Sequence, residues 1–316
     1  MSRQYDEHHR SVMVHEALHY LLGGRIEGTY LDCTAGEGGH IKAILKATNG
    51  QARVIGLDVD REVLDLAEQN LEEYRGKFRL FNSSYVDFET VLRQAGVERV
   101  DGVLLDVGTS TFQLKAKGRG FSYELDEPLD MRMDLSNKIT AADVVNSYSE
   151  SELSRIIFEY GDEKRFARRI AKCIVNRRPL STTRELHDAV KAAMPPAERY
   201  KRKRHFATKT FQAIRIVVNK ELENIEGVLR SIPGFLKQGG RIVFISFHSL
   251  EDGIAKRVFR EKSDSELKIL TKKPIQPSQE EVELNLRARS ARLRAADLKG
   301  GTSRASHNSE AEIAGA

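Results

Sequence analysis

The chain has 316 residues, of which 40% are hydrophobic and 31% are charged. A chain of this length and composition buries a substantial core, which excludes a disulfide-stabilised mini-protein and a wholly disordered protein. Because the formal net charge is only +5, the distribution of the basic residues carries more information than their excess.

The sequence shows no signal for export or membrane insertion. Residues 1–10 are rich in charge and are not followed by the apolar segment of a secretory signal, and no apolar run approaches the roughly 20 residues that span a bilayer. Cys33 and Cys173 are far apart and form no C-x-x-C pattern, which argues against a disulfide framework or a structural zinc site. We therefore expect a cytoplasmic protein that makes no contact with a membrane.

Short apolar runs that end in polar turns alternate with helical patterns along the first hundred or so residues. Such runs are typical of parallel strands that are buried on both faces. Strands are predicted at 29–33, 53–57, 78–81 and 100–105, and at 240–247, with helices at 41–48, 61–74 and 210–229. This alternation predicts an α/β fold with a doubly wound, Rossmann-like parallel sheet.

About a hundred residues separate the fourth predicted strand from the helix at 210–229, far more than an ordinary loop between a strand and a helix. Helical patterns occupy this interval at 149–160, 163–176 and 183–194. We interpret 113–208 as an inserted helical subdomain for substrate recognition and 1–112 with 209–299 as one discontinuous core. Towards the C-terminus we expect a helix at 250–262, a strand at 267–271, a basic tail, and a disordered low-complexity end at 300–316.

The turn after the first predicted strand contains three glycines, Gly36, Gly38 and Gly39, which let the backbone approach a ligand closely. The following helix offers unpaired N–H groups and the positive end of its dipole. Asp58 closes the second strand, where a carboxylate accepts hydrogen bonds from both hydroxyls of an adenosine ribose. Together these features predict a nucleoside-containing cofactor.

The cofactor predicted from these residues is S-adenosylmethionine. A dinucleotide turn requires a third glycine where this chain has Ile41. Asp32 and Asp106 end neighbouring strands, and their carboxylates suit a cationic sulfonium better than a pyrophosphate. A NAD-dependent oxidoreductase built on the same sheet is the disfavoured alternative.

The chain resembles bacterial ribosomal RNA small subunit methyltransferase H, the S-adenosylmethionine-dependent 16S rRNA cytosine-N4 methyltransferases formerly called MraW. The resemblance runs from about His9 to Leu298 and implies a class I methyltransferase sheet. It rests on six strings, at 32–40 (D-x-T-x-G-x-G-G-H), 119–122 (RGFS), 128–134 (PLDMRMD), 210–216 (TFQAIRI), 246–252 (SFHSLED) and 287–291 (RARSA).

The resemblance also implies which residues bind the methyl donor. They are Gly38, Gly39, His40, Asp58, Tyr85, Asp106 and Gln113, and the ring of Tyr85 is expected to flank the adenine. Two loops depart from the family pattern, because Phe112 and Phe206 stand where the family has proline. The implied reaction is methylation of the N4 amine of a decoding-centre cytidine, cytidine 1402 in the family, in 16S rRNA within the small ribosomal subunit.

We expect the methyl-transfer pocket to comprise the loop from Asp106 to Gln113 together with Ser246 and His248 across the sheet. Attack by the amine develops positive charge on nitrogen, so an acceptor placed beside it lowers the barrier. Asp106, Ser246 and His248 are therefore the candidate catalytic residues. The alternative for Asp106 is a simple acid in a turn, and for His248 a role in helix capping or core packing.

Basic residues cluster in three places. Residues 164–178 contain seven Lys or Arg and no acid, and 199–209 contain six, interleaved with Tyr200 and Phe206. The predicted tail adds Arg287, Arg289, Arg292, Arg294 and Lys299. Any one run could be a solvated helix face, but three favour contact with RNA phosphates, and the target base is then expected to be flipped or single-stranded.

The segment from His15 to His19 matches the H-E-x-x-H pattern of zinc proteases. No third ligand follows at a suitable spacing, so we interpret it as a helix packed on the sheet and predict no metal site. The rival functions are a non-catalytic RNA-binding ribosome assembly factor that retains this fold and a methyltransferase acting on a protein or a small molecule. The oligomeric state is not predicted.

Overall fold

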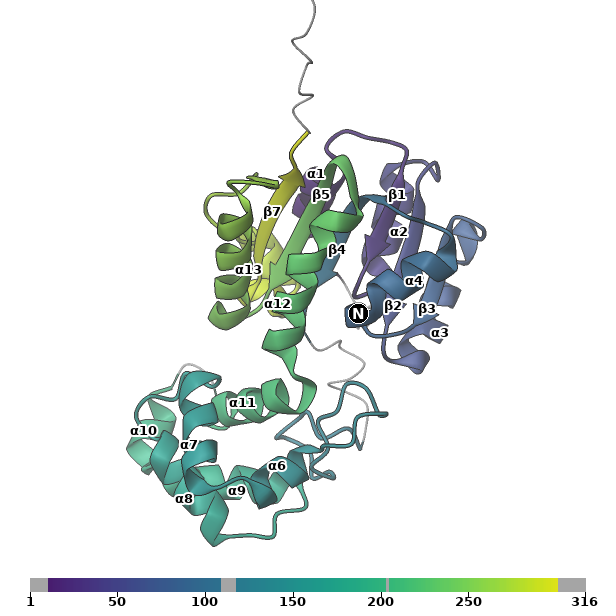
Figure 1. Ribbon diagram of the computed structural model, residues 1–316. Coiled ribbons are helices and arrows are strands. Elements are labelled where there is room, and N and C mark those ends of the chain that lie inside the picture. The colour runs from purple at the N-terminus through teal and green to yellow at the C-terminus, as the bar shows by residue number, and fades with distance from the viewer. Residues whose placement is uncertain (1–10, 109–117, 203–204, 301–316) are drawn as a thin grey trace, which may run out of the picture.

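The computed structural model describes residues 11–108, 118–202 and 205–300. A seven-stranded sheet with the order β3-β2-β1-β4-β5-β7-β6 forms the core (Figure 1). The strands are β1 (Thr29–Asp32), β2 (Arg53–Asp58), β3 (Phe78–Asn82), β4 (Val100–Asp106), β5 (Leu236–Ser246), β6 (Leu267–Ile269) and β7 (Arg292–Leu298). The pairs among β1 to β5 are all parallel, which confirms the predicted α/β fold with a doubly wound, Rossmann-like sheet.

Apolar side chains on alternate sides of each strand are covered by helices on both faces of the sheet. On β4, Leu104 belongs to one apolar cluster while Val103 and Leu105 belong to the other. The first face carries α1 (Val14–Leu22), α2 (Gly39–Ala47) and α3 (Arg61–Asn70), and the second carries α4 (Phe88–Ala95), α12 (Glu221–Ser231) and α13 (Ser249–Lys262). Burial on both faces explains why these strands are continuous apolar runs in the sequence.

The C-terminal part of the sheet corrects the sequence prediction. Residues 292–298, interpreted as a basic tail, form β7, which pairs antiparallel with both β5 and β6. The arginines concealed the strand, because Arg294 is buried and its guanidinium donates to the carboxylate of Asp252 at 2.6 and 3.2 Å. Of the predicted disordered end at 300–316, residues 301–316 lie outside the described residues.

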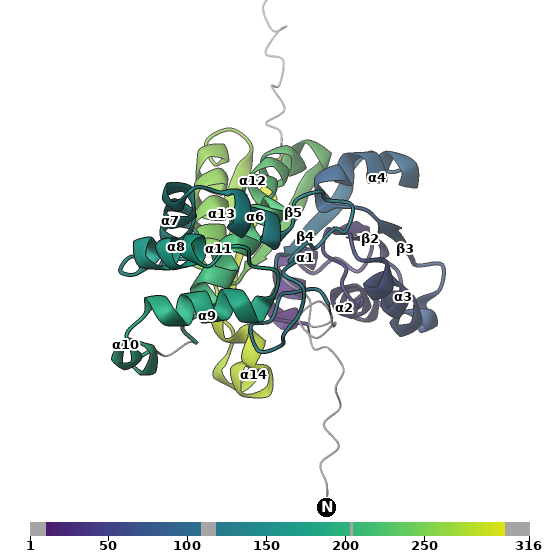
Figure 2. The same ribbon diagram turned by 90° about the horizontal axis from the view of Figure 1, so that it is seen from below.

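A second lobe of helices follows β4 and lies below the sheet in Figure 1. It has its own apolar core, drawn from buried residues between Phe121 and Val218. Viewed from below, it lies on the side of α12 and α13, away from α3 (Figure 2). Its helices are α6 (Ala141–Ser147), α7 (Glu150–Glu159), α8 (Ala167–Asn176), α9 (Thr183–Ala193), α10 (Pro196–Tyr200) and α11 (Thr208–Asn219).

The helix predicted over 210–229 is two helices, α11 and α12, separated at Lys220. Lys220 has φ 49°, a left-handed conformation that ends α11 and starts α12 in a new direction. The amide of Asn219 fixes the break, since its Nδ2 donates to Met131 O at 2.8 Å and its Oδ1 accepts from Met133 N at 2.7 Å. The hydropathy pattern continues through the break, so the sequence alone did not reveal it.

The remaining helical segments are short. They are α14 (Gln279–Leu284) and 3-10 turns at Glu72–Tyr74, Tyr85–Asp87, Ile232–Phe235 and Leu286–Ser290. In α1, Ala17 and Leu21 are buried against the sheet while His15 and His19 are exposed, as expected of a packing helix. Among the described residues, the helices are too short or too polar to cross a membrane.

Candidate cofactor and substrate site

The turn between β1 and α2 brings backbone atoms to the carboxyl end of the sheet. Gly36 has a left-handed φ of 51°, and α2 begins at Gly39. A Cβ on Gly39 would lie 2.0 Å from Oγ and 3.2 Å from Cβ of Ser11, so a larger residue there requires the segment that precedes α1 to shift. The open N-terminal N–H groups of α2 therefore lie at the edge where parallel α/β sheets bind ligands.

Asp58, the last residue of β2, is bonded to the same turn. Its Oδ2 accepts from the N–H of Gly36 and its Oδ1 accepts from the N–H of Asp60, each at 3.0 Å. Burial raises the pKa of Asp58 to about 6 in spite of these hydrogen bonds. Because each carboxylate oxygen has a second lone pair, Asp58 is still able to accept hydrogen bonds from the hydroxyl groups of a ribose.

Asp106, the last residue of β4, pairs with His40 in the first turn of α2. His40 Nε2 and Asp106 Oδ2 are 3.3 Å apart, within hydrogen-bond distance. The other carboxylate oxygen, Asp106 Oδ1, is buried and has no hydrogen-bond partner among the described residues. Burial lowers the pKa of His40, but the hydrogen bond and charge of Asp106, with the charge of Asp32, outweigh it, so the pKa lies above its usual value. Burial raises the pKa of Asp32 itself to about 6.

A cavity of about 370 Å³ opens between the ends of these strands and the helical lobe. Both parts of the protein contribute to its walls. The sheet side supplies Thr34, Gly36, Asp58, Tyr85, Asp106, Gly108 and Phe247, among others, and the other side supplies Met133, Asp134, Asn137, Asn219, Lys220 and Glu221. The structure therefore places a nucleoside-sized space against the predicted cofactor turn.

Most of the predicted donor-binding residues meet at this cavity. Asp58, Tyr85 and Asp106 line it directly, and Gly38, Gly39 and His40 form the adjoining turn and the start of α2. Gln113 lies outside the described residues, as does Phe112. Tyr85 is largely buried, and burial raises the pKa of its phenol, with the charges of Glu221 and Glu251 adding to the effect.

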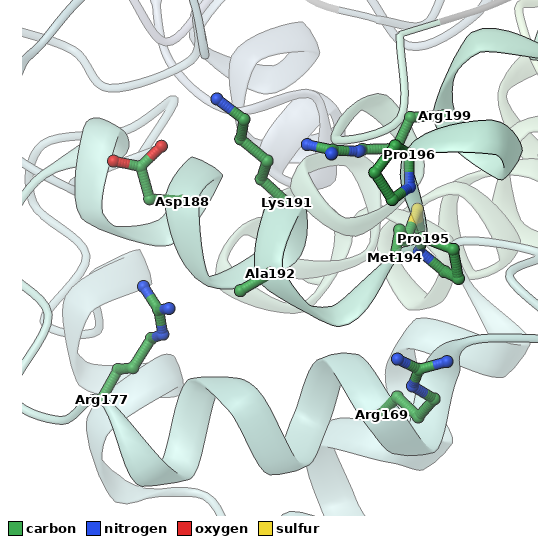
Figure 3. Close-up of a pocket in the computed structure, with 9 residues that line it drawn as sticks. All are labelled: Arg169, Arg177, Asp188, Lys191, Ala192, Met194, Pro195, Pro196 and Arg199. Carbon is green, nitrogen blue, oxygen red and sulfur yellow. The ribbon is translucent and has the colours of Figure 1, made fainter.

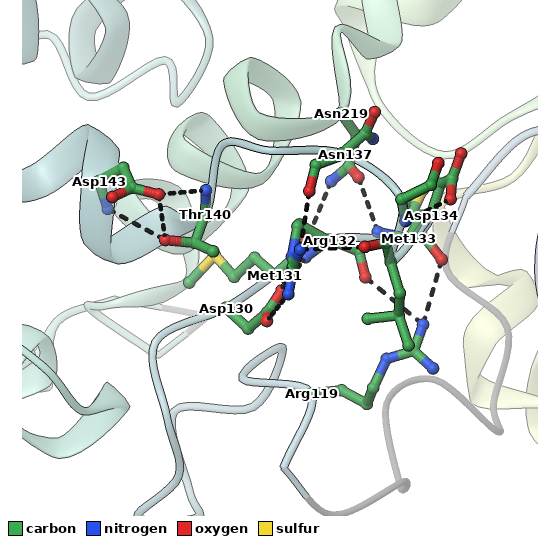
Figure 4. Close-up of polar contacts among 12 residues, drawn as sticks. Arg119, Asp130, Met131, Arg132, Met133, Asp134, Asn137, Thr140, Asp143 and Asn219 are labelled. Atoms are coloured by element: carbon green, nitrogen blue, oxygen red, sulfur yellow. Dashed lines mark hydrogen bonds and ion pairs between the residues drawn. The ribbon is translucent and has the colours of Figure 1, made fainter.

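Part of the wall contributed by the helical lobe is a loop that Arg132 and Arg119 hold in shape (Figure 4). The Arg132 guanidinium donates to the Asp130 carboxylate at 2.8 Å and to the carbonyl of Asn137 at 2.7 Å. Arg119 donates to the carbonyl of Met133 at 3.1 Å and, with its other nitrogen, to Asp60 of the core at 3.1 Å. These bonds tie the loop to the end of β2, beside Asp58.

The loop places Met133, Asp134 and Asn137 in the cavity wall, and sequence reasoning did not select any of them. The string at 128–134 carried the family resemblance, but nothing in its pattern distinguishes residues that point inward from those that form the loop's own hydrogen bonds. Asp130, for example, is occupied by Arg132.

Ser246 and His248 were predicted at the pocket, but neither is among the residues that line the cavity. Ser246 is fully buried and its hydroxyl donates to the carbonyl of Arg292 at 3.3 Å. His248 caps α13, where Glu251 in turn accepts from the N–H groups of Phe247 at 2.7 Å and His248 at 3.1 Å. The turn instead presents Phe247 to the cavity.

Glu221 lies close to this turn, and one ligand atom each from Glu221, His248 and Glu251 fall within 4.8 Å of one another, a spacing that could hold a metal ion. Glu221 is already engaged, because Arg215 donates to its two carboxylate oxygens at 2.8 and 2.9 Å. We therefore assign structural roles to all three residues. Glu221 forms an ion pair across the break at Lys220, and His248 and Glu251 form the cap of α13.

The basic runs of the helical lobe divide into structural and exposed residues. Arg178 donates to the carbonyls of Val145 and Tyr148, and Arg202 pairs with the buried Glu163. Four other cations surround a hollow between α8, α9 and α10, and among the described residues none of them forms an ion pair (Figure 3). They are Arg169, Arg177, Lys191 and Arg199.

Phe206 packs in an aromatic cluster beside this hollow. Its ring centroid lies 4.1 Å from that of His205 and 5.0 Å from that of His187, and the guanidinium of Arg199 lies 5.8 Å from it. His205 also stacks on Tyr123 at 4.3 Å. Ring packing thus fixes Phe206 beside Arg199.

Comparison with known proteins decides the family. The family model described as the MraW methylase family matches residues 6–299. The chain belongs to the MraW methylase family. Two relatives, both named ribosomal RNA small subunit methyltransferase H, come from Kosmotoga olearia (64% identical, 94% of this chain and 99% of the relative) and Thermotoga neapolitana (56% identical, 94% and 98%). A solved rRNA methylase from Streptococcus thermophilus is 11% identical, with a TM-score of 0.44 over 91% of this chain and 95% of that chain.

S-adenosylmethionine is the cofactor of this MraW methylase. Three structural observations show that the residues at the cavity fit it. The glycine turn leaves space against the backbone, Asp58 retains acceptor capacity for a ribose, and the buried carboxylate of Asp106 has an oxygen without a hydrogen-bond donor among the described residues. A cationic sulfonium compensates buried carboxylates of this kind, whereas a pyrophosphate would repel them.

Proposed function

We propose that this MraW methylase transfers a methyl group to the N4 amine of a decoding-centre cytidine, cytidine 1402 in the family, in 16S rRNA of the small ribosomal subunit in the cytoplasm. The names of the relatives support rRNA as the substrate. The observation that carries the proposal is the cavity itself, which is shared between the cofactor turn and the helical lobe and contains the carboxylate of Asp106.

S-adenosylmethionine, when bound, supplies an electrophilic methyl group on a sulfonium. The exocyclic amine of cytosine is a weak nucleophile, and positive charge develops on its nitrogen as it attacks. We assign Asp106 to accept a hydrogen bond from that amine and to stabilise the charge. His40, through its contact with Oδ2, holds the carboxylate at the end of β4.

Ser246 and His248 enter this proposal as positioning residues. The hydroxyl of Ser246 anchors the end of β5 to β7, and the cap formed by His248 and Glu251 fixes the start of α13. Between them Phe247 lines the cavity and packs against Gly108, where a Cβ would lie 3.1 Å from the ring. An aromatic face there suits a flipped pyrimidine base.

The basic hollow of the helical lobe is the proposed site of contact with the rRNA backbone. Arg169, Arg177 and Lys191 are exposed, and Arg199 is half-buried beside Phe206. Cations without carboxylate partners are the groups that phosphates attract most strongly. A substrate held there and a base inserted into the cavity would use both lobes at once, as expected for the helical subdomain proposed at 113–208.

The test is to incubate the protein with methyl-labelled S-adenosylmethionine and small ribosomal subunits that lack the modification, and then to map the label. We expect one labelled cytidine with the label on N4, and loss of labelling in Asp106→Asn. Labelling of a different base or atom contradicts the proposal. Binding of the methyl donor without any transfer to subunits favours the non-catalytic assembly factor instead.

A further inference from the structure

The cavity contains a cation from a part of the chain far from the glycine turn. Arg287 lines it from the 3-10 turn at Leu286–Ser290, which sequence analysis assigned to a basic tail. Among the described residues that line the cavity, the cations are Arg287 and Lys220. Lys220 stands at the break between α11 and α12, on the wall where the helical lobe begins, so the two cations belong to different parts of the site.

The turn that carries Arg287 is fixed to the core. Ala288 is fully buried in the apolar cluster under α1 and α2, and the side chain of Asn285 accepts from the N–H of Arg287 at 3.2 Å. In the preceding helix α14, Glu281 accepts from the N–H of Met13 at 2.6 Å. The C-terminal segment therefore packs against the start of α1, beside the glycine turn, and holds Arg287 in a defined place.

Arg287 lines the cavity in the presence of two acidic residues that act on its charge. Burial lowers the pKa of the Arg287 guanidinium, and the opposing influences come from Asp106 at the end of β4 and Glu37 in the glycine turn. Asp58, which is placed to accept the ribose, ends β2 on the other side of β1. The acids whose charges act on Arg287 thus stand at the end of β4 and in the glycine turn.

The methyl donor has opposite requirements at its two ends. Its adenosine end is neutral and needs hydroxyl acceptors, which Asp58 supplies. Its methionine end carries a carboxylate as well as an ammonium and a sulfonium, and a carboxylate entering a site rich in Asp and Glu needs a cation beside it. Arginine suits this task because its planar guanidinium donates to both oxygens of a carboxylate.

Building on the proposed function, we propose that Arg287 binds the carboxylate of the methyl donor's methionine end. The C-terminal segment thereby completes the cofactor site and makes it selective for ligands that carry an amino acid. The proposal assigns a ligand-binding role to the first arginine of the 287–291 string, which the predicted donor-binding set does not contain.

The experiment compares two ligands that share the adenosine part, S-adenosylhomocysteine, which has the carboxylate, and 5′-methylthioadenosine, which lacks the amino acid. Their dissociation constants are measured by calorimetry for the wild type, Arg287→Gln, Arg287→Lys and the matched control Arg289→Gln. Arg289 is exposed on the same turn. We expect Arg287→Gln to weaken the binding of S-adenosylhomocysteine about 10- to 100-fold, while the affinity for methylthioadenosine changes less than about 2-fold.

The affinity of Arg287→Lys for S-adenosylhomocysteine is expected to lie between those of the wild type and Arg287→Gln. The affinity of Arg289→Gln is expected to match that of the wild type. Equal weakening of both ligands in Arg287→Gln would mean a structural role and overturn the inference. Unchanged affinity for both ligands would overturn it as well, and would fit an arginine that contacts RNA phosphate. If the wild type binds neither ligand, it is the proposed function that fails, so the two failures are distinguishable.

Discussion

His40 and Asp106 form a largely buried pair beside the glycine turn, with 3.3 Å between Nε2 and Oδ2. His40 lies in the first turn of α2 and Asp106 ends β4, so the pair joins α2 to the carboxyl edge of the sheet. The pair occupies one carboxylate oxygen of Asp106 and leaves Oδ1 without a hydrogen-bond donor among the described residues. An acid that is half satisfied in this way is a strong candidate for contact with a cation or an amine.

Asp106→Asn retains the size of the side chain but removes its charge. We expect the single-turnover rate of methyl transfer to fall by about 10²–10³-fold, the range typical of removing one preorganised electrostatic interaction with a transition state. Affinity for the methyl donor should fall less, by about 10-fold, since Asp58 and the glycine turn remain. Rapid-quench assays and calorimetry measure the two separately, and a variant with both values unchanged would refute the role of Asp106.

The raised pKa of Asp58 predicts that donor affinity depends on pH. Its pKa of about 6 in the folded protein exceeds the ordinary value of 3.8, so the carboxyl group is protonated below about pH 6 and becomes an ionised acceptor above it. We expect the dissociation constant of S-adenosylhomocysteine to be constant above about pH 7 and to rise as the pH falls through 6. Calorimetry between pH 5 and 8 gives the profile.

The control for this prediction is Asp58→Asn, which should bind more weakly at pH 8 and lose most of the dependence between pH 5 and 7. A profile that keeps its full slope in this variant would assign the titration to another group, such as the buried Asp32, whose pKa is also about 6. The free energy of unfolding of the unliganded protein changes over a lower, overlapping range, because a carboxyl group with a raised folded pKa lowers this free energy as the pH rises from about 4 to 6.

The sequence was sufficient for those parts of the fold and site that depend on local patterns. Parallel strands buried on both faces appear as apolar runs, and the acids that end them, Asp58 and Asp106, fall at one edge because parallel strands share a carboxyl end. The glycine turn was visible because close backbone approach excludes other residues. These features predicted the sheet and several of the residues that line the cavity.

Features that depend on tertiary partners were not visible in the sequence. The strand β7 was missed because Arg294 becomes acceptable in the core only through Asp252, which lies 42 residues earlier. The break at Lys220 was missed because the side chain of Asn219 stabilises it by bonding to a distant loop. Arg287 was assigned to the tail because no local pattern brings residue 287 to a turn at residues 36–38.

The ion pair of Arg215 and Glu221 spans the break at Lys220, and both side chains are largely buried. Removing one member leaves the other as an unpaired buried charge, so Arg215→Met or Glu221→Gln should each reduce the free energy of unfolding by about 3 kcal/mol. The free energy of unfolding of the double variant should fall by clearly less than the sum of the losses in the two single variants. Urea denaturation measures all three, and strictly additive losses would show that the pair is not coupled.

Salt dependence tests the basic hollow as the region that binds rRNA. Each phosphate that a variant no longer neutralises should lower the slope of log affinity against log salt by about 0.7 to 0.9. Arg169→Gln with Arg177→Gln should therefore weaken binding to small subunits and reduce that slope by about 1.5, while affinity for S-adenosylhomocysteine stays unchanged. Arg184→Gln, an exposed position on α9 outside both basic runs, is the matched control. Filter binding over a range of salt concentrations gives the slopes. If the double variant and the control show the same slope, the protein binds phosphates through another surface.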